Sequence, residues 1–173
     1  MIRKALKSDI EKVAQIYDHI HDRTDNAAGK TGWIKGIYPT IDTAKNAFSA
    51  DELYIMEDEN GKVVAAARIN QKQEESYKKA EWLYKAEPQE VLVLHTLVVD
   101  PMESGKGYGK KFVAFYEDLA KKRGIKVLRM DTNEKNTPAR TLYEKLGFHE
   151  AGIVPCDFNG LPDIMLVCLE KKL

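Results

Sequence analysis

Residues 98–111 read VVDPMESGKGYGKK, and the rest of the chain is expected to support this stretch. Val99 closes an apolar run that begins at Val91. Pro101 has no backbone N–H, so it fits only at the edge or the end of a strand. Three glycines then follow at alternate positions: Gly105, Gly107 and Gly109. The stretch therefore predicts a buried strand that ends in a glycine-rich loop.

A helical pattern begins directly after this loop. Apolar residues recur at the spacing i, i+3, i+4, i+7 as Phe112, Phe115, Tyr116 and Leu119. Glycine allows positive φ angles and a close approach of the backbone to a ligand. The first amides of a helix lack intrahelical acceptors and point toward negative charge. Strand, loop and helix together predict an anion site for a phosphate or pyrophosphate.

The composition is that of an ordinary globular protein. The chain has 173 residues, 43% hydrophobic and 31% charged, which suits one domain over 1–173. Lys+Arg and Asp+Glu both number 27, and this zero net charge disfavours a nucleic-acid partner. Basic residues nevertheless outnumber acidic ones between Pro101 and Lys126, which suits a polyphosphate or a charged outer helix face.

The two cysteines, Cys156 and Cys168, are expected to be reduced and structural. Two thiols without C-x-x-C spacing do not make a tetrahedral zinc site, so no metal is expected. No apolar run reaches 18 residues and no leader-like segment opens the sequence. We therefore expect a cytoplasmic protein with no membrane partner.

Periodicity and turn residues predict the other elements. Strands are expected at Ile2–Leu6, Leu53–Glu57, Val63–Asn70, Val91–Val99, Lys126–Asp131, Phe148–Ile153 and Ile164–Glu170. A first helix is expected to begin at Ser8, with a Ser8/Glu11 capping box, and to fray near Asp22–Asn26. Further helices are expected at Asp42–Ala50, at Phe112–Arg123 and from a Thr137 cap to Gly147. This order predicts an α/β (α+β) fold with a mixed sheet flanked by helices.

Two connecting segments carry large aromatic residues. The loop from Gly29 to Thr40 holds Trp33 and Tyr38, which either plug the core or line a pocket. The polar segment from Gln71 to Glu90 holds Trp82 and Tyr84. A segment this long inside a domain is either substrate-facing or a mobile insertion with a short helix. These four aromatic residues are candidate substrate contacts.

Nucleotide motifs do not fit the glycine loop. A P-loop places a glycine five residues after its first glycine, and that position is Lys110. The dinucleotide fingerprint G-x-G-x-x-G and the kinase loop of the same spacing also fail at Lys110.

The pattern that fits is Q/R-x-x-G-x-G/A after a strand ending in V-x-P. Val99-Asp-Pro101 and Gly107-Tyr108-Gly109 carry it, and a second signature spans Asn136, Ala139, Tyr143, Gly147 and Phe148. Here the sequence resembles the GNAT family of N-acetyltransferases over nearly its whole length, most strongly from Val91 to Phe148. One position differs from the family's pattern: Ser104 stands where the family has Gln or Arg.

The resemblance implies an acyl-CoA N-acyltransferase fold, a mostly antiparallel sheet of about six to seven strands, with acetyl-CoA as cofactor. It implies that backbone N–H groups of the loop hold the pyrophosphate and that the central strand pairs with pantetheine where it parts from its neighbour near a bulge. The cofactor residues so implied are Leu97, Val98, Val99, Ser104, Gly105, Lys106, Gly107, Tyr108, Gly109, Lys110, Asn136, Ala139 and Tyr143.

Tyr143 is the candidate general acid. A thiol and a tyrosine have pKa values of ~8.5 and ~10, so a phenol can donate a proton to a leaving thiolate. Helical spacing alone makes Tyr143 a core aromatic residue, and only the signature around it favours catalysis. Glu90, Glu81 and His95 are candidate bases, although His95 in an apolar strand also fits a core histidine or a substrate contact, and water can replace a dedicated base.

Three functions remain open at this point. The first is acetyl transfer from acetyl-CoA to a primary amine of a small molecule or peptide. The second is a non-catalytic acyl-CoA-binding sensor or partner-binding module, and the third is a basic-loop nucleic-acid binder that lacks a recognition helix. The sequence is compatible with a monomer or a homodimer.

Overall fold

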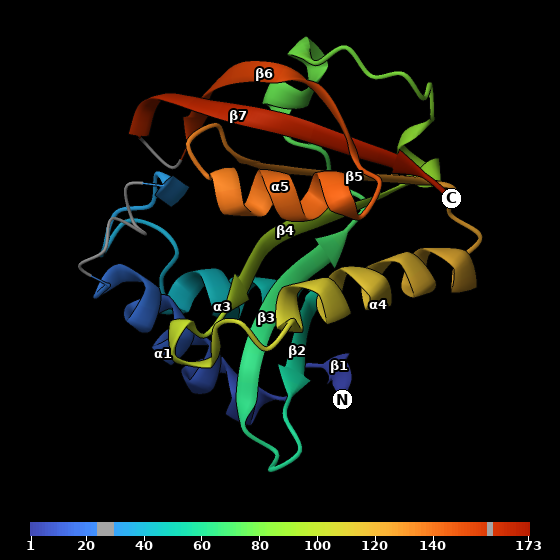
Figure 1. Ribbon diagram of the computed structural model, residues 1–173. Helices are drawn as coiled ribbons and strands as arrows, with labels where there is room; N and C mark the ends of the chain where they lie inside the picture. The colour runs from blue at the N-terminus through green and yellow to red at the C-terminus, as the bar shows by residue number, and fades with distance from the viewer. Residues whose placement is uncertain (24–29, 159–160) are drawn as a thin grey trace. The chain divides into compact units, whose positions relative to one another are not determined.

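The computed structural model describes residues 1–23, 30–158 and 161–173 (Figure 1). Residues 24–29 lie outside the described residues, and both Gly29 and most of the predicted frayed helix end fall there. The strands are β1 (Ile2–Lys4), β2 (Leu53–Glu57), β3 (Val63–Asn70), β4 (Val91–Val99), β5 (Val127–Asn133), β6 (His149–Phe158) and β7 (Leu161–Lys172). The α-helices are α1 (Ile10–His21), α3 (Ile41–Ser49), α4 (Tyr108–Lys122) and α5 (Thr137–Lys145), and the short 3₁₀ turns are η1 (Lys7–Asp9), η2 (Glu75–Lys79), η3 (Pro88–Glu90) and η4 (Pro101–Glu103).

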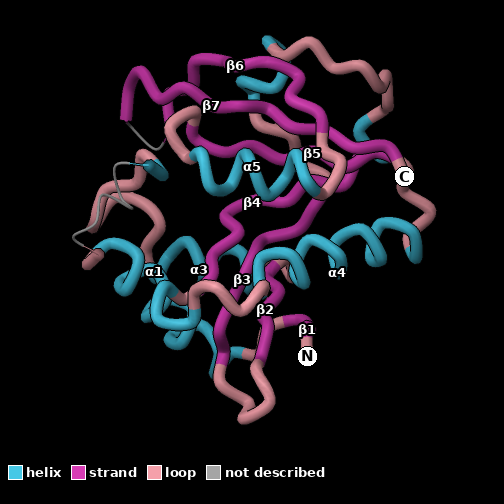
Figure 2. Tube along the Cα trace, viewed as in Figure 1, coloured by secondary structure: helices cyan, strands magenta, loops and turns pink. Residues whose placement is uncertain are grey.

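The strands form a seven-stranded sheet in the order β1-β2-β3-β4-β5-β7-β6, drawn in magenta in Figure 2. β1–β2, β2–β3, β5–β7 and β6–β7 pair antiparallel, whereas β4 and β5 pair in parallel. The predicted mixed, mostly antiparallel sheet of about six to seven strands is thus confirmed.

The chain divides into two compact units, and the prediction of one domain over 1–173 stays a prediction. The first unit comprises Met1–Ala28, Trp33–Ile69 and His95–Tyr116. The second comprises Gly29–Gly32, Asn70–Leu94 and Glu117–Leu173.

The core of the first unit joins the apolar faces of α1 and α3 to β2 and β3. α1 buries one stripe, which includes Val13, Ile16 and Tyr17, as its helical spacing predicts. In Figure 1 α1 and α3 lie side by side, and their buried residues share one cluster with those of the strands. Ala66 of β3 belongs to this cluster, so its small side chain admits the helices close to the strand.

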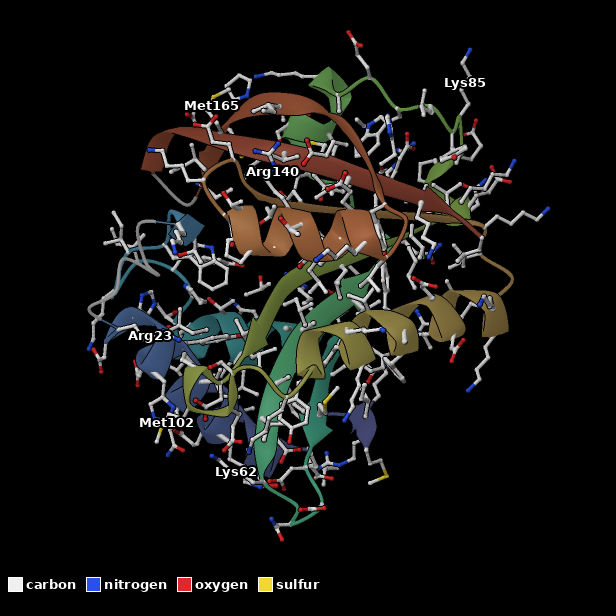
Figure 3. The ribbon with its side chains drawn as sticks, in the orientation of Figure 1. Arg23, Lys62, Lys85, Met102, Arg140 and Met165 are labelled. Atoms are coloured by element: carbon white, nitrogen blue, oxygen red, sulfur yellow. The ribbon has the colours of Figure 1, made fainter. Side chains whose placement is uncertain are left out.

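The core of the second unit lies between β5, β6 and β7 and the segment from Gln71 to Glu90. Tyr77 of η2 is 2% exposed and shares a cluster with Val127 and Cys168. The segment therefore packs on this sheet face and carries the 3₁₀ turns η2 and η3, so it is not the mobile insertion given as one alternative. Figure 3 shows Lys85 extending outward from the segment into solvent.

Two helix starts differ from the sequence predictions. α1 begins at Ile10 after η1, so Ser8 does not cap it; the Asp9 carboxylate instead accepts the Leu6 N–H at 2.9 Å. α5 is capped by Asn136, whose side chain accepts the Ala139 N–H, and Thr137 is already helical. Both errors have one cause: several adjacent residues could serve as caps, and the tertiary fold selects among them.

Buried charges fasten the segment Gln71–Glu90 to the sheet. The Arg129 guanidinium donates to Gln73 Oε1 at 2.6 Å and to the Tyr84 carbonyl at 2.8 Å, and it stacks 4.1 Å from the Trp82 ring centroid. Glu170 of β7 is fully buried and accepts the Leu83 N–H at 2.5 Å. Hydrogen bonds to a buried carboxylate are worth more than neutral ones, so Glu170 is expected to stabilise this segment.

Replacing Glu170 by Gln should lower the free energy of unfolding by about 1–3 kcal/mol. The amide keeps the shape of the side chain, but it removes the negative charge near Arg129 and one acceptor oxygen. Urea denaturation measures the change, with Glu144→Gln on the exposed face of α5 as the matched control, expected within about 0.5 kcal/mol of wild type. A Glu170→Gln variant as stable as this control would contradict the assignment.

Candidate active site

The predicted glycine loop has the backbone that its sequence requires. Gly105 and Gly107 have φ angles of +81° and +74°, in the left-handed region that favours glycine. A Cβ at either position would meet nothing within 4 Å, so the space in front of the loop is open. Gly109 lies in the first turn of α4, which begins at Tyr108, four residues earlier than the predicted Phe112. The loop thus leads directly into the helix N-terminus.

Six consecutive amides of this loop are left without acceptors. The first amide of α4 with a backbone acceptor is that of Lys111, which donates to the Gly107 carbonyl at 3.0 Å. In the described part of the chain the N–H groups of 105–110 donate to no protein atom. Amides at a helix N-terminus attract anions through their hydrogens and the helix dipole. The geometry therefore fits a phosphate group.

A buried carboxylate holds the start of the loop. Asp100 is 2% exposed, its N–H donates to the Val64 carbonyl at 2.8 Å, and its Oδ1 accepts the Met102 N–H at 3.0 Å. His19 Nδ1 of α1 lies 3.1 Å from the same oxygen, so His19 contacts the start of the loop. Lys62 of the β2–β3 hairpin, which is labelled in Figure 3, has its Nζ 3.8 Å from Oδ2 of Asp100. β3, α1 and the loop are thereby tied at one point.

Ser104, which stands where the GNAT pattern has Gln or Arg, and the nearby Lys106 have polar groups that are partly bonded within the protein. The Ser104 N–H donates to the Pro101 carbonyl at 3.3 Å, so Ser104 offers chiefly its hydroxyl to a ligand. Lys106 pairs with Glu103 at 2.6 Å, and this contact raises the pKa of the Lys106 ammonium. Arg23, labelled in Figure 3, lines the same open groove as Ser104.

The second half of β4 contains a strained residue. Thr96 has a φ of +51°, which is rare for a β-branched side chain and marks a distortion of the strand. Its hydroxyl is hydrogen-bonded to the Tyr38 hydroxyl, and Tyr38 packs edge-to-face on Trp33 with ring centroids 5.8 Å apart. The structure thus brings two predicted substrate residues to the strand that holds His95, Leu97, Val98 and Val99. Such strain gathers at functional sites.

The remaining predicted substrate residues and bases lie in the second unit. Trp82 donates its indole N–H to the Tyr77 carbonyl at 2.8 Å and lies beneath Arg129, so it anchors the segment. Tyr84 accepts from Arg129 through its carbonyl. Glu81 and Glu90 have exposed side chains, and Glu90 accepts the Glu87 N–H at 2.9 Å. Their proposed roles stay predictions.

Tyr143 is buried on α5. It is 7% exposed and packs against Phe148 with ring centroids 6.1 Å apart. Burial, helped by the charge of Asp131, raises the pKa of its phenol well above the ordinary value, so Tyr143 is neutral at physiological pH. Among the described residues its hydroxyl has no hydrogen-bond partner. An uncharged phenol with an uncommitted proton is suited to donate to a developing anion.

Asp131 is a residue that the sequence predictions missed. Its Oδ2 accepts the Tyr77 hydroxyl at 2.6 Å, and burial raises the pKa of this carboxyl to about 6. In the sequence it was only the last residue of an expected strand. Two signals bear on it: a carboxylate follows the apolar residues Val127, Leu128 and Met130, and Tyr77 is one of three aromatic residues in the polar segment 71–90.

The profile of the "Acetyltransferase (GNAT) family" matches residues 14–148. The chain belongs to the GNAT acetyltransferase family. A [ribosomal protein bS18]-alanine N-acetyltransferase of Haemophilus ducreyi is 33% identical over 70 residues, which are 40% of this chain and 48% of that protein. The chain spans about a third to a half of the length of the curated GNAT relatives it matches first.

Solved GNAT structures share the fold. An acetyltransferase of Streptococcus agalactiae is similar with a TM-score of 0.82 and 19% identity, covering 100% of this chain and 95% of that chain. An acetyltransferase of Salmonella typhimurium, solved with its cofactor acetyl-CoA, is similar with a TM-score of 0.70 and 20% identity over 100% and 93% of the two chains. Among the described residues, no helix has the length and apolarity to cross a membrane.

Replacing Asp131 by Asn should stabilise this GNAT protein at neutral pH. Because the folded state holds the Asp131 proton more tightly than the unfolded chain, wild type loses stability as the pH rises from ~4 to about 6. Asn cannot ionise and still accepts the Tyr77 hydroxyl, so the variant should gain about 1–3 kcal/mol at pH 8 and almost nothing at pH 4.

Urea denaturation at the two pH values measures this difference. Asp118→Asn on the exposed face of α4 is the control and should change stability by less than about 0.5 kcal/mol at either pH. A loss of stability in Asp131→Asn at pH 8 would show that the Asp131 charge stabilises the fold.

Proposed function

We propose that this protein is an N-acetyltransferase that transfers an acetyl group from acetyl-CoA directly to a primary amine of a small molecule or peptide. The observation that carries the proposal is the set of free amides at 105–110, which open into solvent at the start of α4. Membership of the GNAT family supports the choice of acetyl-CoA over other phosphate-bearing ligands. The bacterial relatives named for ribosomal protein bS18 make a protein N-terminus one acceptor to test.

The residues of the loop fit coenzyme A. Gly105 and Gly107 have positive φ, and a Cβ at either position would meet nothing within 4 Å. We assign the pyrophosphate to the N–H groups of Gly105, Lys106, Gly107, Tyr108, Gly109 and Lys110, with the Ser104 hydroxyl beside them. Arg23 lines the same groove as Ser104, and we propose that its guanidinium adds positive charge there.

The strand residues Leu97, Val98 and Val99 are proposed to bind the pantetheine through their backbone. A strand edge offers N–H and C=O groups to an added extended chain, as in β-augmentation. The positive φ of Thr96 lies just before these residues, and the parallel pairing of β4 with β5 ends at Leu94. A backbone N–H there would also stabilise negative charge on a carbonyl oxygen. Asn136 and Ala139, at the capped start of α5, are proposed as further cofactor contacts.

Acetyl-CoA, when bound, supplies an acetyl thioester whose carbonyl carbon a neutral amine can attack. Tyr143 is proposed to donate its phenolic proton to the departing sulfur. Burial raises the pKa of the Tyr143 phenol, so it stays protonated at neutral pH, and burial of a thiolate beside it would raise the pKa of the thiol as well. A proton donor in the right position contributes about 10²–10⁴-fold to a rate.

Replacing Tyr143 by Phe should lower turnover about 100-fold or more while the affinity for acetyl-CoA stays within about threefold. Calorimetric titration measures the affinity, and thiol release with a panel of primary amines and an alanine-starting peptide measures turnover. Tyr54→Phe, a buried tyrosine of β2, is the matched control and should keep both values.

The outcomes separate the candidate functions. Absence of acetyl-CoA binding to wild type would contradict the proposal and the acyl-CoA sensor alike. Binding without thiol release for any amine of the panel would favour the sensor. Unchanged turnover in Tyr143→Phe would remove Tyr143 from the mechanism and leave the acetyltransferase function standing.

A further inference from the structure

Glu103, at the start of the glycine loop, pairs with two lysines at once. Its Oε1 accepts from the Lys62 ammonium at 2.7 Å, and its Oε2 accepts from the Lys106 ammonium at 2.6 Å. The Glu103 side chain is 13% exposed, whereas those of Lys62 and Lys106 are 48% and 59% exposed. The contacts with Lys106 and Lys62 lower the pKa of the Glu103 carboxyl to about 2, so Glu103 is charged at physiological pH.

The two lysines differ in where they are anchored. Lys62 belongs to the β2–β3 hairpin and also lies 3.8 Å from Asp100 Oδ2, so two carboxylates hold it beside the hairpin. Lys106 stands in the loop itself, between two glycines with open space before them. It is the one cation of residues 104–107. The pair with Glu103 therefore withholds the loop's own positive charge from this open space.

The pair between Glu103 and Lys106 is one that a stronger anion can open. Exposed ion pairs contribute little to the free energy of unfolding, because water screens them and the ordering of long side chains costs entropy. A phosphate held by the amides of 105–110 lies within reach of the flexible four-carbon stem of Lys106. Glu103 keeps Lys62 as a partner after Lys106 leaves, so the exchange strands no charge.

We propose that Glu103 is an internal counter-anion of the phosphate loop, which holds the Lys106 ammonium in the free protein and yields it to a phosphate group of the bound ligand. This inference rests on the proposed binding of acetyl-CoA to the loop. Glu103 competes with the ligand for Lys106, so it sets the affinity of the loop without touching the ligand. Lys62 holds the carboxylate in place during the exchange.

Replacing Glu103 by Gln removes the competing charge and keeps the length of the side chain. The variant should bind acetyl-CoA about two- to fivefold more tightly than wild type at about 20 mM ionic strength, because Lys106 is then available and screening is weak. Calorimetric titration measures the dissociation constant. Glu59→Gln, at an exposed position of the β2–β3 hairpin, removes an equal charge and should leave the constant within about 1.5-fold of wild type.

A double-mutant cycle shows whether this gain passes through Lys106. Lys106→Gln should weaken binding about two- to fivefold, and adding Glu103→Gln to it should bring no gain. Lys110, an exposed lysine in the first turn of α4, supplies the matched comparison. In a Lys110→Gln background the gain from Glu103→Gln should persist. A gain that persists without Lys106 overturns the proposal.

Lys62 gives a second cycle. Lys62→Gln should weaken acetyl-CoA binding about twofold, because Glu103 then holds Lys106 alone and more firmly. In the Glu103→Gln background the same substitution should change nothing. A loss that persists in that background would show that Lys62 itself meets the phosphate, which contradicts its assigned role.

A purely structural role for Glu103 predicts the opposite sign. If the ion pairs serve to order the loop, Glu103→Gln should bind acetyl-CoA more weakly than wild type, and this result would overturn the proposal. Thermal unfolding checks that the fold is kept, since the midpoints of all these variants should stay within about 3 °C of wild type.

Inorganic pyrophosphate is the probe that separates this inference from the proposed function. If wild type binds acetyl-CoA or pyrophosphate but acetylates no amine, the proposed function fails, and the cycles measured with the bound ligand still decide the role of Glu103. If acetyl groups are transferred while Glu103→Gln and wild type bind acetyl-CoA equally well, the inference fails alone. A wild type that binds neither ligand overturns both.

Discussion

The buried carboxylate of Asp100 is the constraint on which the loop of this protein depends. It ends β4, accepts the Met102 N–H that begins η4, and receives His19 from α1. The N–H of the same residue is tied to Val64 of β3. With the strand end fixed in this way, the chain can turn through Gly105 and Gly107 and enter α4 with its first amides unused. A loop that held its own amides could not hold a pyrophosphate.

Much of the fold follows from local sequence signals. β2, β3 and β4 have the predicted bounds because their apolar runs end at strong turn residues, Asn60-Gly61 between the first two and Pro101 after the third. β6 and β7 extend beyond their predicted bounds because they pair with each other along their length, and backbone pairing needs no apolar side chains. The helix starts at Ile10 and Thr137 were displaced for the same kind of reason, since a cap is chosen by tertiary contacts.

The candidate site likewise contains residues that the sequence predicts and residues that it does not. The glycine loop and Tyr143 stand in patterns of fixed spacing, so the sequence alone points to them. Thr96, Asp100 and Asp131 do not, because each owes its character to residues distant in the sequence: Tyr38 for Thr96, His19 for Asp100, and Tyr77 for Asp131. Trp82 and Tyr84 were predicted to contact the substrate. In the structure the Trp82 ring stacks on Arg129 and the Tyr84 carbonyl accepts a hydrogen bond from it, and these contacts hold the segment 71–90 on the sheet.

We propose that the amides of residues 105–110 hold the pyrophosphate of acetyl-CoA. The most direct test of this proposal is a titration of ¹⁵N-labelled protein with acetyl-CoA, followed by ¹H–¹⁵N correlation spectra. The amide signals of Gly105 to Lys110 should shift together and saturate at one affinity, while the amide of Gly61, in the β2–β3 hairpin, stays in place. If acetyl-CoA shifts other amides and leaves those six unmoved, or shifts none at all, the account of this loop is wrong.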